Sequence, residues 1–331
     1  MQNRVNLTHI TADSYTSYEL YQVDLIKSIH PIKITIPCLR LHPLQAHTLV
    51  HILHILSVYL TSTLYMIHPT DLPATASPSL TMDPSKPILF YDIASGPPVT
   101  CFAPNPWKTR YPLNFKGVHY KTEWVDLPDV TSVRKSLGAA PNRTFADGSP
   151  FYTLPVIKDL STGETVGDSF DIACYLEKTY PDGPALFPPS CSSRGLNVAF
   201  NAQVDAIFTQ HVMLCVHGMP FNPATAEISK ATFLQRAGKT SWDEMAVRGE
   251  ERTKILESFR SALDVLAKAY RHSEGPFLEG STASYADLIV GSWLAFFKAS
   301  VDAKEWEEIQ TWHDGLWGNL HQALGKYAEV K

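Results

Sequence analysis

The sequence has few cysteines, and none of them is spaced as in a redox motif. There are five among 331 residues, at Cys38, Cys101, Cys174, Cys191 and Cys215, and no C-x-x-C occurs. An odd number of cysteines without that motif disfavours both a disulfide scaffold and a dithiol reductase. We therefore expect a reducing compartment, the cytoplasm.

Excess positive charge is also lacking. The chain has 28 Lys and Arg against 33 Asp and Glu, a formal net charge of −5. Nothing in this balance favours a nucleic-acid partner, because such a partner is usually met by a basic surface. Residues 1–81 contain four basic and four acidic side chains, so the net negative charge belongs to the rest of the chain.

Charged side chains are absent from residues 41–70. Within them Thr48–Ile67 is about long enough to cross a bilayer. The stretch is interrupted by histidine, serine and threonine, and it begins too late for an ordinary secretory signal. It is either a membrane span or a loosely attached apolar extension. We expect the extension, with membrane contact through residues 48–67 as the alternative.

The N-terminal region is predicted to be an extension over residues 1–83, poorly ordered or partly helical. His47, His51 and His54 have helical spacing, but no carboxylate or cysteine completes a metal site, so we expect no metal. Met82 opens the stretch Met82–Lys86, which directly precedes the first predicted strand of the folded part. Our hypothesis is that Met82 is the working start and that the preceding region is an addition.

The main sequence pattern is a strand at 87–91 followed by a loop and a helix at 106–116. Asn105 is predicted to cap the helix, because its side chain can accept from a free amide of the first turn. Pro106 suits the first helical position, and Gly117 suits a left-handed stop. The free amides and partial positive charge of such a helix start favour an anion such as a thiolate.

Two more patterns follow. Pro155 precedes an apolar strand and is a candidate cis residue. Asp168 or Ser169 is predicted to cap a helix over 168–178. Between these landmarks we expect further elements by their period and turn residues: a strand at 120–125, a short helix at 130–137, a loop at 138–152, and strands at 154–158 and 164–166.

Residues beyond 193 carry helical periodicity. Long helices are predicted over 199–216, 250–270, 284–298 and 305–327, the last with a break near Asp314–Gly315. Ser284 and Asp287 match a capping box, in which each side chain satisfies an amide at the start of the helix. The helix that follows is apolar on most sides, which is typical of a buried helix.

These patterns, in this order, resemble the cytosolic glutathione S-transferases. The sequence from Asn105 to Gly117 is most similar to that of the fungal FuA class, which is related to bacterial β-etherases. The resemblance covers roughly residues 84–330. It implies a thioredoxin-like α/β domain at 84–183, an all-helical C-terminal domain at 190–330, and a homodimer.

The resemblance also implies a glutathione site. The backbone of Val156, following Pro155, would pair with the cysteinyl unit of the tripeptide. Asp168 and Ser169 would hold the γ-glutamyl end, and plain helix capping is the alternative interpretation of these two residues. Trp107 is expected to offer a backbone amide at the start of the first helix.

The position that carries serine or cysteine in many members of the family falls here on Ala103, whose side chain cannot hydrogen-bond a thiolate. The Asn105 side chain and the charge of Lys108 are the candidate substitutes, since a nearby cation or donor lowers a thiol pKa. Cys101 is a further candidate, as a residue that forms a mixed disulfide with glutathione. A buried bystander is the alternative interpretation of Cys101.

The resemblance implies conjugation of glutathione to hydrophobic aromatic electrophiles, or cleavage of their ethers, in detoxification or secondary metabolism. His211, Met213 and Trp107 are expected to line the second substrate site, with core packing as the alternative. Because Ala103 lacks a hydroxyl, a non-catalytic carrier of glutathione and polyphenols is a second hypothesis. A thiol transferase that uses Cys101 is the third.

Overall fold

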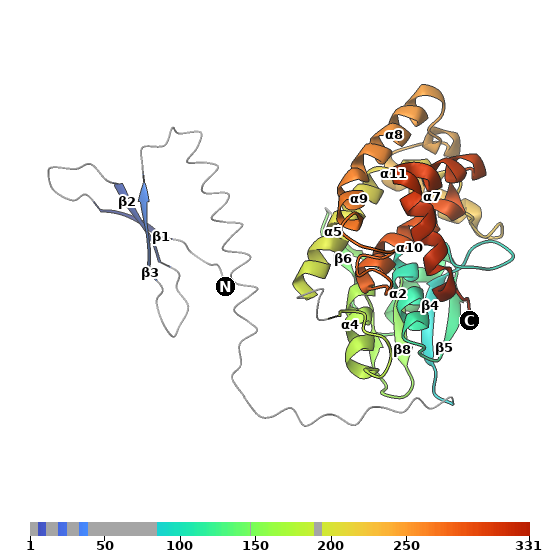
Figure 1. Ribbon diagram of the computed structural model, residues 1–331, viewed down its shortest axis with the longest axis horizontal. Coiled ribbons are helices and arrows are strands. Elements are labelled where there is room, and N and C mark those ends of the chain that lie inside the picture. Colours follow the sequence, from blue (N-terminus) through green and yellow to red (C-terminus); the bar gives the residue numbers. More distant parts are fainter. Residues whose placement is uncertain (1–5, 11–18, 25–32, 39–84, 146, 189–193) are drawn as a thin grey trace. The chain divides into compact units, whose positions relative to one another are not determined.

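The computed structural model describes residues 6–10, 19–24, 33–38, 85–145, 147–188 and 194–331 (Figure 1). The chain divides into two compact units, residues 1–76 and residues 77–331. Thr48–Ile67, which includes His51 and His54, lies outside the described residues, as do His47 and Met82. Among the described helices, none is long and apolar enough to cross a membrane.

The first unit contains a three-stranded antiparallel sheet in the order β1-β2-β3. Its strands are β1 (Asn6–Ile10), β2 (Glu19–Asp24) and β3 (Lys33–Cys38). The sequence analysis expected partial helix or poor order here. The strands are only five or six residues long and are rich in β-branched and aromatic residues, which favour the extended conformation. Segments that short give little periodicity to detect.

The second unit begins with a four-stranded mixed sheet in the order β5-β4-β8-β9. β4 is parallel to β5 and antiparallel to β8, which is antiparallel to β9. The elements of this half are β4 (Ile88–Ile93), α2 (Pro104–Phe115), β5 (Tyr120–Val125), η2 (Leu127–Asp129), α3 (Val130–Ser136), β8 (Val156–Asp159), β9 (Thr165–Val166) and α4 (Ser169–Thr179).

The predicted loop at 138–152 contains a short hairpin instead. Its strands are β6 (Arg143–Thr144) and β7 (Pro150–Phe151). Phe145 packs edge-on against Phe151 with ring centroids 5.0 Å apart, and the Arg236 guanidinium lies 5.6 and 5.4 Å from the two ring centres. Arg236 belongs to the helical half, so this contact between distant segments was not predictable from the loop's own residues.

The rest of the unit is helical. Its elements are α5 (Arg194–Gln210), α6 (Met213–Val216), α7 (Ala226–Ala237), η4 (Trp242–Met245), α8 (Gly249–Ala262), α9 (Asp264–Tyr270), α10 (Tyr285–Ser300), α11 (Ala303–Leu324) and η5 (Gly325–Tyr327). In Figure 1 the sheet occupies the lower half of this unit and α8, α9 and α11 the upper half. Two predicted long helices are each divided, the first after Gln210 and the second at Leu263.

Helix α10 forms the centre of the helical half and joins it to the sheet half. It packs against α2, α5 and α11 (Figure 1). Nearly all its side chains are buried. The predicted capping box is confirmed: Asp287 accepts from the backbone N–H of Ser284 at 2.8 Å and from its hydroxyl at 2.9 Å. The predicted break in α11 is also confirmed, because His313, Asp314 and Gly315 have positive φ values.

Candidate functional site

Helix α2 begins two residues earlier than predicted, at Pro104, with Ala103 as its N-cap and no side-chain cap. The predictions that Asn105 is the N-cap and Pro106 the first helical residue are wrong. Pro104 fits the first position as well as Pro106 does, since neither proline has an N–H to lose there. The predicted stop is confirmed, with φ +65° at Gly117.

This start leaves a single amide in the first three helical positions. Prolines occupy the first and third, so Asn105 carries the one N–H that no carbonyl within the helix can accept from. The Trp107 amide, which we expected to be free, donates to the Ala103 carbonyl at 3.3 Å. The Asn105 side chain is half-buried and, within the described residues, has no hydrogen-bond partner.

Cys101 lies in the core, with 4% of its surface exposed, and its backbone forms a bridge with Ala94. Burial, helped by the nearby Asp92 carboxylate, raises the pKa of the Cys101 thiol to about 12. A nucleophilic cysteine needs a lowered pKa and access to solvent. The interpretation of Cys101 as a buried bystander therefore fits the structure, and a mixed-disulfide role does not.

Lys108 is fully buried and forms an ion pair with Asp205 of α5, at 2.5 Å. The same Asp205 oxygen accepts from the Trp293 indole N–H at 2.7 Å. Burial lowers the pKa of Lys108, while Asp205 and then Asp168 oppose that change. Since Asp205 matches this charge, Lys108 has less attraction to offer a thiolate than the sequence suggested.

The residues proposed to hold the tripeptide stand at the start of β8 and of α4. The Leu154–Pro155 peptide is cis, and Val156 pairs with Tyr91 of β4. Asp168 caps α4, because its Oδ1 accepts from the Phe170 N–H at 2.9 Å. Its other oxygen has no hydrogen-bond partner among the residues that the structure describes. Capping therefore leaves part of this carboxylate available.

The residues expected to line a second substrate site differ in their surroundings. His211 is buried; its Nδ1 donates to the Ile207 carbonyl at 2.7 Å, and its Nε2 accepts from the Ser258 hydroxyl at 3.0 Å. It is a hydrogen-bonded core histidine, so its proposed lining role is not supported. Met213 is half-buried, and Trp107 is buried against Tyr111 with ring centroids 4.8 Å apart.

The loop after β4 reaches the helical half. The Gly96 N–H donates to the Pro220 carbonyl at 2.8 Å, and a side chain at Gly96 would lie 2.8 Å from the Phe221 oxygen. Phe221 contacts Phe233 and Trp242, and all three are half-buried. These three side chains form an aromatic cluster beside the loop that leads to α2. The sequence analysis did not identify this cluster.

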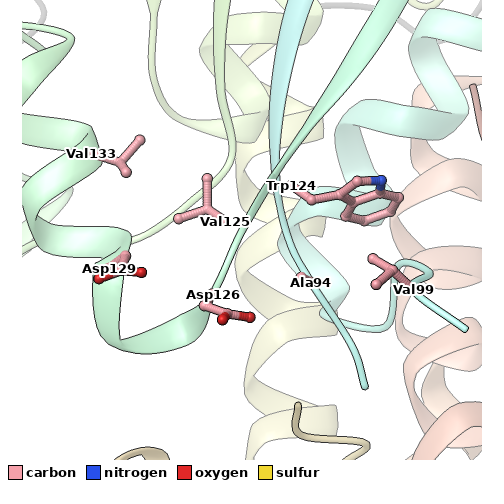
Figure 2. A pocket seen from close by; sticks show the side chains of 7 residues that line it. All are labelled: Ala94, Val99, Trp124, Val125, Asp126, Asp129 and Val133. Atoms are coloured by element: carbon pink, nitrogen blue, oxygen red, sulfur yellow. The ribbon is translucent and has the colours of Figure 1, made fainter. Parts of the chain in front are cut away.

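A pocket of about 340 Å³ opens at the carboxyl ends of β4 and β5. It is lined by residues of the loop after β4, the end of β5, η2 and α3. Figure 2 shows its lining: Ala94, Val99, Trp124, Val125, Asp126, Asp129 and Val133. Its walls are mostly apolar, and the Asp126 carboxylate at its rim accepts from the Asn222 amide at 3.0 Å. The pocket and the aromatic cluster are therefore linked through the segment that contains Asn222.

Among the described residues, no group of three or more histidine, cysteine or carboxylate side chains is placed to hold a metal. Two residues near the candidate site were not identified from the sequence. Asp205 comes from α5 and pairs with a lysine 97 residues away. Arg134 comes from α3 and donates to the backbone carbonyls of Pro155 and Gly167.

Comparison with known proteins gives one family. The model of the glutathione S-transferase N-terminal domain matches residues 102–179, and that of the C-terminal domain matches residues 195–327. A relative, the glutathione S-transferase-like protein ustS of Aspergillus flavus, is 29% identical over 266 residues, covering 76% of this chain and 94% of that protein.

Solved structures of fungal proteins agree. The glutathione S-transferase CsGST63524 of Ceriporiopsis subvermispora, in complex with glutathione, is 37% identical with a TM-score of 0.68, covering 74% of this chain and 98% of its own. The transferase GSTFuA3 of Phanerochaete chrysosporium is 33% identical with a TM-score of 0.66, covering 74% and 98%. The chain has a thioredoxin-like half and an all-helical half, and it belongs to the glutathione S-transferase family.

Proposed function

We propose that this protein is a glutathione transferase that adds glutathione to hydrophobic aromatic electrophiles or cleaves their ethers. The observation that carries the proposal is the 37% identity to a transferase solved with glutathione, together with the Pro155 turn and the capped start of α4. Detoxification or secondary metabolism is the proposed biological setting, and the cytoplasm the proposed location.

The start of α4 supports binding of the γ-glutamyl end. A helix start carries partial positive charge, which favours the carboxylate of that group, and the buried Ser169 lies at the first helical position. The second oxygen of Asp168 is available for the ammonium of the same group. The backbone of Val156 is proposed to pair with the cysteinyl unit, placing the sulfur near the start of α2.

The start of α2 is proposed to stabilise the thiolate. A free thiol with a pKa near about 8.5 is only a few per cent ionised at neutral pH. Lowering that pKa by about two units requires about 2.7 kcal/mol of preference for the anion. The Asn105 backbone N–H and side-chain amide are two donors that together match this magnitude, since a hydrogen bond to a charged group contributes about 1.5–3 kcal/mol.

The electrophile is proposed to bind on the side of the loop after β4. The aromatic cluster of Phe221, Phe233 and Trp242 and the apolar wall around Val99 both border this loop. Aromatic side chains favour aromatic ligands through stacked and edge-on contacts. We therefore expect variants of this cluster to change the KM for the electrophile more than the KM for glutathione.

Variants of Asn105 test the proposal. Conjugation of glutathione to 1-chloro-2,4-dinitrobenzene is the assay, with calorimetry of glutathione binding beside it. Asn105→Ala removes the side-chain donor and keeps the N–H, whereas Asn105→Pro removes both. We expect kcat to fall about tenfold for the first and further for the second, with exposed Gln235→Ala as the unchanged control. A wild-type protein that does not bind glutathione would refute the proposal.

A second candidate function is a carrier that binds glutathione and polyphenols without turnover. The observation that favours it is Ala103, which gives α2 no side-chain cap and the sulfur no hydroxyl. Saturable binding of both ligands with no product would support this function. Homodimer formation is likewise proposed from the family resemblance, and light scattering of the purified protein measures it.

A further inference from the structure

Arg134 is a buried cation that binds backbone carbonyls on both sides of the candidate glutathione site. Its side chain comes from α3, and 1% of the residue is exposed. Nε donates to the Ala140 carbonyl at 2.8 Å, and Nη1 donates to the carbonyls of Thr153 at 2.5 Å and Pro155 at 3.4 Å. Nη2 donates to the Gly167 carbonyl at 3.2 Å.

This arrangement uses the shape of arginine. The planar guanidinium has five N–H donors in a fixed fork, so one side chain can bind carbonyls from several segments at once. Among the described residues, no carboxylate lies within ion-pair distance of Arg134. Burial lowers its pKa, while the nearby Asp168 opposes that change. The charge is therefore compensated mainly by backbone dipoles.

Gly167 is matched to this arginine. A Cβ at Gly167 would lie 2.8 Å from Nη2 and 3.1 Å from Cζ of Arg134. Contacts that short require the guanidinium to move, so a glycine is needed for the approach. The next residue, Asp168, has φ 150° and caps α4. The arginine, the glycine and the cap thus form one connected unit.

We propose that Arg134 is a positioning residue for glutathione. It fixes the turn that carries Pro155 relative to the turn that carries Gly167, and these two turns precede Val156 and Asp168. The inference rests on the proposed function, which assigns those two residues to the tripeptide. Because Arg134 is buried beneath the turns, it acts through them and does not touch the ligand.

The test compares four variants with the wild-type protein. Arg134→Met removes every donor, Arg134→Lys keeps the charge but not the fork, and Gly167→Ala pushes the guanidinium away while leaving the arginine in place. Arg252→Met is the matched control, because Arg252 also binds carbonyls and an acid, Glu305, but from α8 in the helical half. Glutathione binding is measured by calorimetry, and KM and kcat by conjugation.

We expect Arg134→Met and Gly167→Ala to raise the Kd and the KM for glutathione about tenfold, a change of about 1.4 kcal/mol, with kcat at saturation and the KM for the electrophile little changed. Arg134→Lys recovers part of the affinity. Arg252→Met lowers thermal stability but leaves the Kd unchanged. A residue with a purely structural role would reduce the amount of active protein without raising this KM.

The outcomes separate the two proposals. If the wild-type protein binds no glutathione, the proposed function and this inference both fall. If the wild-type protein binds it and Gly167→Ala or folded Arg134→Met binds it equally well, the inference alone is overturned. If Arg134→Met does not fold, Gly167→Ala decides the question, because it keeps the arginine and changes only its approach to the turn.

Discussion

Removal of the Asp287 carboxylate should destabilise the protein more than loss of an ordinary helix cap. Asp287 is fully buried, and its Oδ2 accepts from the backbone N–H and the hydroxyl of Ser284. Its Oδ1 accepts from the Leu278 N–H at 2.8 Å, in the segment before the helix. The carboxylate therefore fixes both the start of α10 and the chain that enters it.

The magnitude follows from these contacts. Asp287→Ala leaves the buried N–H of Ser284 and the part-buried N–H of Leu278 without an acceptor, at about 1–3 kcal/mol each. Part of that loss is offset, because burial raises the pKa of Asp287 and the variant no longer buries a charge. We expect the free energy of unfolding to fall by about 3 kcal/mol. Ser284→Ala loses the contacts of the hydroxyl with the backbone and the carboxylate of Asp287 and should lower the free energy of unfolding by about 1 kcal/mol.

Urea unfolding followed by tryptophan fluorescence measures these losses, provided that the slope of the transition stays constant. The matched control is Asp302→Ala, since Asp302 caps α11 by accepting from the Lys304 N–H at 2.9 Å but is exposed. It should lose about 1 kcal/mol at most. A loss at Asp287→Ala no larger than the loss at Asp302→Ala would contradict the reasoning, because burial would then add nothing.

Three further predictions follow from buried polar groups. Cys101 should resist iodoacetamide at about pH 8 in the native protein and react in urea, as peptide mapping would show, because burial raises its pKa to about 12. Asp205→Asn should lower the free energy of unfolding by about 2 kcal/mol or more by leaving the buried Lys108 without its partner, while Asp243→Asn, at an exposed ion pair, should change little in the same urea titration. Burial also raises the pKa of Asp92 from 3.8 to about 6. The folded state therefore binds the proton of the Asp92 carboxyl more tightly than the unfolded state does. The stability that this protonation contributes is lost as the pH rises through about 6. Asp92 is buried in an ion pair with Arg110, with 2.7 Å between Oδ2 and Nη2, and relative to Asp92→Asn the wild-type free energy of unfolding should fall between about pH 4 and 7. A parallel pH profile of the two proteins would refute this assignment.

The features that could be predicted from the sequence act over a few residues. A capping box joins Ser284 to Asp287, three positions along, and the Asp168 cap reaches Phe170, two positions along. The left-handed φ at position 117 favours glycine, because a side chain would strain that conformation. Such signals are encoded locally, so the order of the strands and helices in residues 88–179 followed from them, apart from the hairpin of β6 and β7, which was predicted as a loop.

The features that were missed depend on residues far apart in the chain. Lys108 looked like a free cation because Asp205, its partner, lies 97 residues later on another helix. Nothing in the sequence around Arg134, in a short predicted helix, indicates its contact with the carbonyl of Gly167, which lies 33 residues later. Packing decides such pairs, and no spacing in the sequence reveals them.

The start of α2 shows how a small local error changes the chemistry. Two prolines one residue apart make either Pro104 or Pro106 an acceptable first helical residue, and the choice depends on how the preceding loop packs. With Pro104 first, the Asn105 side chain cannot cap the helix. Its backbone N–H is then the single amide in the first three helical positions, and no carbonyl within the helix can accept from it. If the thiolate lies at this donor, as we propose, the hydroxyl that Ala103 lacks is not required. A backbone donor survives any substitution except proline, so a transferase that relies on it needs no serine or cysteine at this position.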